Sequence, residues 1–159
     1  MPECGKNEAG ASNQQGVHVM VVQALIIAGA SIFGLLGTVH LVYTFFTDKF
    51  DPRDAPTKEA MKATSPVLTR RTSVWDAWIG FNASHSLGAM LFAAMYLSLA
   101  GAHMPTLQGS PALFWLPVVA SGAYLALAKR YWFRTPFIGI AIATMCFGAA
   151  ALTLTFSPR

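Results

Sequence analysis

The chain has 159 residues, enough for one domain, and 54% of them are hydrophobic whereas only 11% are charged. Soluble domains carry about 25% charged residues, so this composition excludes an ordinary soluble protein and indicates a membrane protein. The formal net charge of +4 does not indicate nucleic-acid binding, because the basic residues are concentrated in two segments that connect apolar runs.

The N-terminal part of the chain combines a polar stretch with a long apolar one. Residues 1–16 are polar and have no apolar periodicity, which predicts a disordered tail. Residues 17–46 are predicted as the first membrane span, which is longer than the about 20 residues that a span needs. Small residues recur at every fourth position of this span and predict a face for close helix packing: Ala30, Gly34 and Thr38.

The longest connection, residues 47–72, contains one predicted helix. Asp54 stands before Ala55 and Pro56, which is typical of a helix start, and Ser65 with Pro66 indicates a stop. The sequence therefore predicts a short amphipathic helix over residues 56–63, lying at the membrane surface.

Residues 73–100 are predicted as the second span, and Ser73 with Asp76 fits a capping box at its start. Two faces of this helix differ in character. Small residues predict a packing face: Gly80, Ser84 and Gly88. Larger polar and aromatic residues share another face: Trp75, Trp78, Asn82 and His85.

The C-terminal part of the chain predicts two further spans. Residues 101–109 are predicted as a short loop, and residues 111–129 as a third span that Pro117 is expected to kink. Residues 136–156 are predicted as the fourth span. The predicted fold is thus all-α, a four-transmembrane-helix bundle with a short amphipathic helix in its first loop, forming a single domain over residues 17–159.

The distribution of basic residues predicts the topology. Nine of the 11 Lys and Arg residues lie in the connections at residues 47–72 and 129–134. Cytoplasmic loops are enriched in Lys and Arg. Both connections are therefore expected in the cytoplasm, and both termini outside it.

Simple depth arithmetic predicts which polar groups of the first two spans meet. At ~1.5 Å per residue, His40 lies roughly 9 Å inside the end of the first span. Counted from the start of the second span, Asp76 lies at roughly 5 Å, Asn82 at roughly 14 Å and His85 at roughly 18 Å. In antiparallel neighbours His40 then falls between Asp76 and Asn82, so we expect His40 to contact Asn82 and to couple more weakly to His85.

Each of these residues also has a purely structural interpretation. Asp76 is favoured as a helix N-terminal carboxylate that the helix dipole stabilises. His40 near a span end can bond a backbone carbonyl, and Asn82 can link two helices through a hydrogen bond. His85 near mid-membrane is harder to explain in this way, because a polar side chain at that depth needs a partner.

The functional hypothesis is a membrane-embedded binding module with a polar pocket between the first two spans, on their cytoplasmic half. The pocket would hold an apolar small molecule or a membrane-protein partner. Its predicted binding residues come from both spans: His40, Tyr43, Trp75, Trp78, Asn82 and His85. Tyr43 and Trp75 are expected to close it on the cytoplasmic side. The lipid bilayer is the surrounding partner, and no nucleic-acid partner is expected.

Two alternatives involve chemistry, so the sequence leaves open whether the protein is an enzyme. In the first, His40 and His85 act on a lipid-soluble substrate and Asp76 or Asn82 orients one imidazole, which makes His40, His85 and Asp76 the catalytic candidates. In the second, both histidines ligate a haem, which their different depths disfavour. Two histidines and one carboxylate within the membrane predict no di-metal site, and no cofactor is assigned.

Three stretches resemble an uncharacterised family of small bacterial four-span integral membrane proteins. They are residues 40–50 (HLVYTFFTDKF), residues 64–69 (TSPVLT) and residues 78–88 (WIGFNASHSLG). The resemblance covers roughly residues 17–100. It implies a four-span fold and a multi-pass location in the inner membrane of the cell, and it implies no activity.

Overall fold

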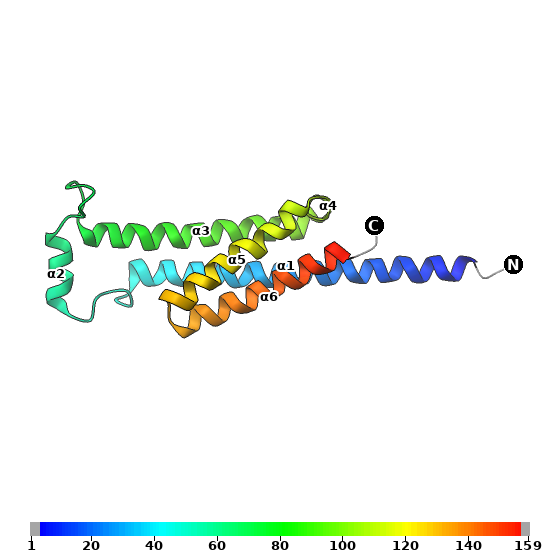
Figure 1. Ribbon diagram of the computed structural model, residues 1–159, viewed down its shortest axis with the longest axis horizontal. Coiled ribbons are helices and arrows are strands. Elements are labelled where there is room, and N and C mark those ends of the chain that lie inside the picture. Colours follow the sequence, from blue (N-terminus) through cyan, green and yellow to red (C-terminus); the bar gives the residue numbers. More distant parts are fainter. Residues whose placement is uncertain (1–3, 157–159) are drawn as a thin grey trace. The chain divides into compact units, whose positions relative to one another are not determined.

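A computed structural model describes the backbone of residues 4–156 and the side chains of residues 14–156 (Figure 1). The elements in order are α1 (Cys4–Phe46), α2 (Ala55–Ala63), α3 (Val74–Ala102), α4 (Met104–Gly109), α5 (Pro111–Tyr131) and α6 (Arg134–Phe156). Four helices are long and apolar enough to cross a membrane: α1 over Gln14–Phe46, α3, α5 and α6. The predicted all-α fold class, with four spanning helices and a short helix in the first loop, is confirmed.

Helix boundaries differ from the predictions in two places. α1 begins at Cys4, so the backbone of residues 4–16 is helical where a disordered tail is predicted. Once an apolar span is helical, each added residue gains a hydrogen bond, and residues 4–16 contain no proline to stop it. α4 lies in the predicted loop of residues 101–109, where the buried Met104 and Leu107 share one helical face.

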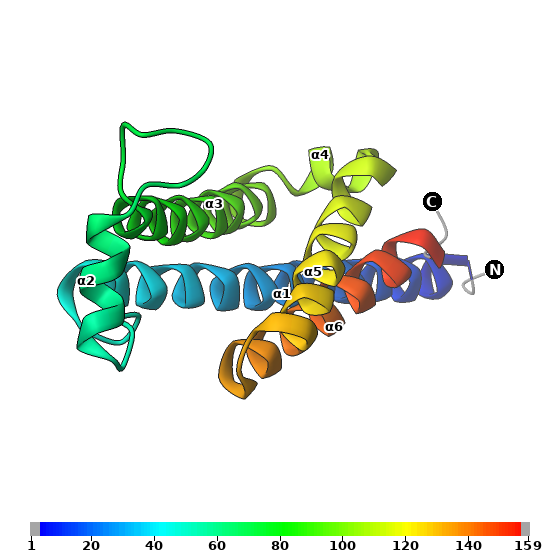
Figure 2. The ribbon, with the colours of Figure 1, turned by 60° about the vertical axis from the view of Figure 1, so that its left-hand side comes forward.

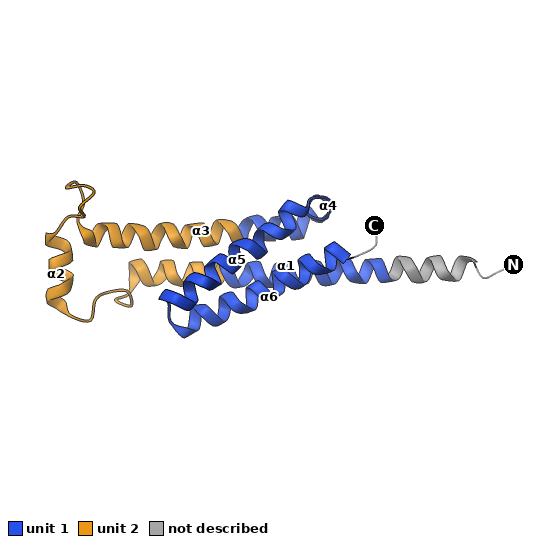
Figure 3. Ribbon diagram, viewed as in Figure 1, with its two compact units in different colours: residues 1–33, 93–159 blue, residues 34–92 orange. Residues whose placement is uncertain are grey.

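The chain forms two compact units, to which α1 and α3 both contribute (Figure 3). The hairpin unit comprises Met1–Phe33 and Ala93–Arg159, and the loop unit comprises Gly34–Phe92. In the hairpin unit α5 and α6 run side by side (Figures 1 and 2). The loop unit contains α2, whose N-cap Asp54 accepts a hydrogen bond from the Thr57 backbone N–H at 3.0 Å, as the helix start predicts.

The core of the hairpin unit is centred on Phe147 of α6. The Phe147 ring lies 6.3 Å from the ring of Phe33 on α1 and 6.0 Å from that of Tyr96 on α3, measured between centroids. A Cβ atom placed at Gly29 would lie 2.9 Å from Phe147 Cζ. Gly29 therefore allows α1 to approach this ring closely, and a larger residue there would displace it.

Pro117 lies inside α5 and is fully buried. Because proline has no backbone N–H, the carbonyl of Leu113 four residues earlier lacks its helical donor. The hydroxyl of Tyr96 donates to this carbonyl at 3.0 Å, and Tyr96 is 0% exposed. A side chain of α3 thus satisfies the acceptor that the proline leaves open, and α5 continues to Tyr131.

In the loop unit α1 packs against α3 at Gly37. A Cβ atom placed there would lie 3.0 Å from the backbone oxygen of Ser86 and 3.1 Å from Ala89 Cβ. The buried residues of α3 in this unit are spaced by four and three positions: Asn82, Ser86 and Ala89. This heptad-like spacing is typical of two helices packed nearly antiparallel.

The predicted packing face of the second span is wrong. Among the described residues, no neighbouring atom lies within 4 Å of a Cβ placed at Gly80 or Gly88, and Ser84 is exposed. Four-residue spacing alone did not identify the face, because it fits several stripes of one helix, whereas the buried stripe follows Asn82 and Ser86.

The predicted packing face of the first span is correct only at its first residue. Ala30 is fully buried, while Gly34 is half-buried and Thr38 is exposed. Thr38 instead donates its hydroxyl to the carbonyl of Gly34 on its own helix at 2.7 Å.

Candidate functional site

The predicted contact between His40 and Asn82 is confirmed. His40 Nε2 lies 3.0 Å from Asn82 Oδ1. The amide nitrogen of Asn82 donates to the carbonyl of Trp78 at 2.8 Å, so the amide oxygen faces the imidazole and can only accept. His40 Nε2 therefore carries the proton and donates it, which leaves Nδ1 as the acceptor nitrogen of the neutral ring.

Local packing explains how the two side chains meet. Gly37 and His40 are neighbours on one face of α1, three residues apart. The missing side chain at Gly37 brings the backbone of α1 close to Ser86 of α3. One turn further along this antiparallel pair, His40 faces Asn82, which is only 5% exposed. The same turn of α1 is reinforced by the buried Thr44, whose hydroxyl donates to the His40 carbonyl at 2.8 Å.

His85 joins the same group of side chains. Its ring lies edge-on to that of His40, with 5.4 Å between the centroids. The depth arithmetic placed His85 deeper and overstated the separation. Side chains lean toward the N-terminus of their own helix, so in antiparallel helices His40 leans inward while His85 leans back toward the loop side. We call His40, Asn82 and His85 the histidine cluster.

Aromatic rings surround the histidine cluster. Phe50, in the loop after α1, lies 4.4 Å from His40 between ring centroids, and its ring is 6.2 Å from that of Tyr43. Phe81 lies nearly parallel to His85, at 6.3 Å and an interplanar angle of 14°. The polar groups of the cluster are therefore set among apolar rings, the composition that is usual for small-molecule sites.

Phe50 is the residue that the sequence prediction of the site missed. Its backbone carbonyl accepts a hydrogen bond from the indole nitrogen of Trp78 at 3.2 Å, which ties the loop to α3. Phe50 rather than Trp75 therefore covers the cluster together with Tyr43. The available signal was a lone large apolar residue within the charged sequence Asp48-Lys49-Phe50-Asp51.

Trp75 and Asp76 lie apart from the histidine cluster. The Trp75 ring is 4.8 Å from Lys58 Nζ and faces the connection that contains α2. Asp76 belongs to the capping box, because its backbone N–H donates to Ser73 Oγ at 3.0 Å and its carboxylate accepts from that hydroxyl at 2.6 Å. Within the part of the chain that the structure describes, Asp76 contacts neither imidazole, so Asn82 is the group that orients His40.

The arrangement offers one oriented imidazole, a second imidazole in contact with it, and an amide. Such groups can bind the polar head of an otherwise apolar molecule, or exchange a proton with it. Over residues 14–156, no group of three or more His, Cys, Asp or Glu side chains is placed to hold a metal ion.

The four long apolar helices make the chain a multi-pass membrane protein. Its function is inferred from the chemistry of the histidine cluster itself. No protein-family model, curated protein or solved structure matches the chain.

Proposed function

We propose that the protein is a membrane-embedded binding module, and that its histidine cluster holds the polar head of an apolar ligand. The observation that carries this proposal is the hydrogen bond between His40 and Asn82. Polar side chains within a membrane span are costly and are retained for function or packing specificity. Packing alone requires no particular tautomer, whereas this pair fixes one and leaves His40 Nδ1 as an acceptor.

The surroundings of His85 support entry of the ligand from the bilayer. Phe81, which lies parallel to His85, is 66% exposed, and His85 itself is half-buried. An apolar molecule moving in the lipid therefore reaches His85 along an aromatic surface, while Phe50 and Tyr43 lie on the loop side of His40. The second candidate ligand of the histidine cluster is a membrane-protein partner, which would bind it through a polar residue in its own span.

A native purification tests this proposal directly. The full chain is purified from its own membranes, and extracted small molecules and associated subunits are identified by mass spectrometry. We expect one apolar molecule or one subunit in stoichiometric amount with the wild type, and its loss with His85→Ala. His103→Ala is the matched control, because His103 is exposed at the start of α4. Equal recovery from both variants would contradict a role for the cluster.

The alternative function is an enzyme that acts on a lipid-soluble substrate through His40 and His85. The edge-on contact of the two imidazoles, with 5.4 Å between the ring centroids, favours it, because two acid–base groups that close can act on one bound molecule. An enzyme would convert the bound molecule in the purified wild type and would lose turnover with either histidine replaced by Ala. Asp76→Asn would leave turnover unchanged, since Asp76 is engaged with Ser73. Haem ligation is less favoured, because His40 Nε2 is hydrogen-bonded to Asn82. A Soret band in the purified protein would favour haem ligation over the other candidate functions.

We further propose that the chain belongs to an uncharacterised family of small bacterial four-span proteins and lies in the inner membrane with both termini outside the cytoplasm. The placement of nine of the 11 Lys and Arg residues in two connections supports this orientation. A reporter that is active only outside the cytoplasm should work when fused after Arg159 and fail when inserted at Lys58. The reverse pattern would invert the topology.

A further inference from the structure

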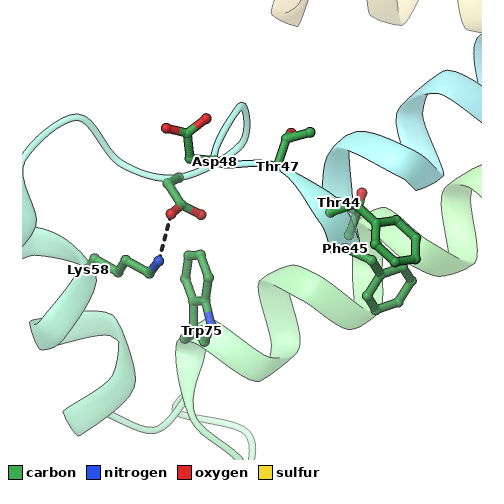
Figure 4. Close-up of a pocket in the computed structure, with 8 residues that line it drawn as sticks. Thr44, Phe45, Thr47, Asp48, Lys58 and Trp75 are labelled. Carbon is green, nitrogen blue, oxygen red and sulfur yellow. Dashed lines mark hydrogen bonds and ion pairs between the residues drawn. The ribbon is translucent and has the colours of Figure 1, made fainter.

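A hollow of about 480 Å³ lies in the loop unit where α1 ends and α3 begins (Figure 4). Its lining comes from the last turn of α1, the loop that follows, α2 and the first turn of α3. The histidine cluster does not line it. The hollow is therefore a second candidate site, with different side chains.

On one side of the hollow, the ammonium group of Lys58 is fixed by two contacts. Lys58 Nζ donates to Asp51 Oδ2 at 2.6 Å and lies 4.8 Å from the centroid of the Trp75 ring (Figure 4). Asp51 is therefore neutralised by Lys58. An ammonium group has three N–H donors, so Lys58 keeps further donors for an anionic ligand.

The other side of the hollow carries an available anion. Asp48 lines the hollow, and in the view of Figure 4 its carboxylate points away from Lys58 and Trp75. Among the side chains of residues 14–156, none forms an ion pair or hydrogen bond with this carboxylate. Thr44 also lines the hollow; its hydroxyl donates its proton to the His40 carbonyl and keeps its lone pairs as acceptors.

The remaining N–H donors of Lys58 and the carboxylate of Asp48 match a zwitterion that has a phosphodiester and an ammonium. Lys58 would bind the phosphodiester and Asp48 the ammonium, both through charge-assisted hydrogen bonds. A primary ammonium suits the carboxylate and hydroxyl acceptors because it has N–H donors. A quaternary ammonium has none and is recognised by open aromatic faces, whereas Lys58 already lies over the ring of Trp75.

The position of the hollow indicates a lipid as the source of this headgroup. α1 ends at Phe46 and α3 begins at Val74, so the hollow lies at the end of two spans, at the level of the membrane surface. Phe45 and Phe46 are exposed beside it, by 56% and 80%, and offer apolar surface to acyl chains. We propose that this hollow binds an ethanolamine phospholipid, with Lys58 on the phosphodiester and Asp48 on the ammonium.

The test is native mass spectrometry of the full chain in detergent, titrated with ethanolamine, choline and glycerol phospholipids that have identical acyl chains. We expect about tenfold tighter binding of the ethanolamine lipid than of the choline lipid. Asp48→Asn should abolish this preference, and Lys58→Gln should weaken both lipids, since both contain the phosphodiester. Glu59→Gln and Lys62→Gln are the matched controls, because these residues pair with each other on α2 at 2.8 Å and do not line the hollow.

Several outcomes would overturn the proposal. Equal binding of ethanolamine and choline lipids would show that the hollow does not recognise the ammonium. Tighter binding of the glycerol lipid would show that it recognises only the anionic phosphodiester. Glycerophosphoethanolamine binding as tightly as the intact lipid would show a soluble ligand. An unchanged lipid preference in Asp48→Asn would exclude Asp48, and this variant is suited to the test because no described contact of the Asp48 carboxylate is lost.

This inference is independent of the function proposed for the histidine cluster. His85→Ala should leave the preference for the ethanolamine lipid unchanged, and Asp48→Asn should leave recovery of the apolar ligand or subunit unchanged. Loss of the lipid preference in His85→Ala would mean that the two groups form one site, and would overturn a separate headgroup site.

Discussion

The hairpin unit and the loop unit use their polar side chains differently. In the hairpin unit, Tyr96 bonds the carbonyl of Leu113 and Gln23 bonds the carbonyl of Ala100, at 3.0 and 2.8 Å. In the loop unit, His40 bonds the side chain of Asn82 and its ring contacts that of His85. Bonds from side chain to backbone serve the helices themselves. The helices do not need the bond between the side chains of His40 and Asn82 to satisfy their backbones. This difference distinguishes the candidate site from residues that only support the fold.

The largest expected effect lies in the core of the hairpin unit. Phe147→Ala should lower the free energy of unfolding by about 3–5 kcal/mol, because it empties the space among Gly29, Phe33 and Tyr96. Reversible unfolding in mixed micelles, followed by circular dichroism, measures this change. Phe156→Ala on the same helix is the control, since Phe156 is exposed. Equal effects at both positions would mean that Phe147 is not a core residue.

The next effect tests the side-chain-to-backbone bond at the proline. Tyr96→Phe leaves the Leu113 carbonyl without a donor and should cost about 1–3 kcal/mol of unfolding free energy. Pro117→Ala in the same chain restores the backbone N–H, so the double variant should regain most of that stability. The same unfolding measurement decides this. A double variant no more stable than Tyr96→Phe alone would separate Tyr96 from the proline.

A smaller effect is expected at the histidine cluster. Asn82→Ala should cost about 0.6 kcal/mol, the average for interhelical hydrogen bonds in membranes, while abolishing ligand binding. In a double-mutant cycle this cost should disappear once His40 is replaced by Ala. Ser86→Ala is the control, because Ser86 bonds only the Asn82 carbonyl of its own helix. If the losses of unfolding free energy at His40 and Asn82 were additive and ligand recovery were unchanged, Asn82 would have only a structural role.

The smallest effect separates the two faces of α3. Gly88→Leu should change the unfolding free energy by less than about 0.5 kcal/mol, because no described neighbour meets a side chain there. Gly37→Leu should reduce the amount of folded protein, since its Cβ would lie 3.0 Å from the Ser86 backbone oxygen. The yield of monodisperse protein in detergent compares the two. A loss of yield confined to Gly88→Leu would reverse the assignment of faces.

Hydropathy and helix-start signals predicted the four spans and α2, because a span must satisfy its own backbone and so depends on local sequence. The contact between His40 and Asn82 was also predictable, since depth along two antiparallel helices follows from counting residues. Counting gives no rotation about a helix axis and no side-chain lean. The packing face of α3 was therefore misassigned, and His85 was placed too far from His40.

Residues in connections were harder to predict. Phe50 reaches His40 only because the loop folds back to Trp78, and no local pattern encodes that return. α4 was missed because its six residues contain Pro105, which fits a helix start as well as a loop. In both cases packing against another element, rather than local preference, determines the structure.

The hydrogen bond from Tyr96 to the carbonyl of Leu113, four residues before Pro117, also has an evolutionary consequence. Each residue alone is a liability in a membrane, because the proline exposes an acceptor and the buried hydroxyl needs one. Two liabilities that cancel should be inherited together. In relatives of this chain we expect a proline at the position of Pro117 wherever a hydroxyl-bearing side chain occupies that of Tyr96, and the paired loss of both elsewhere.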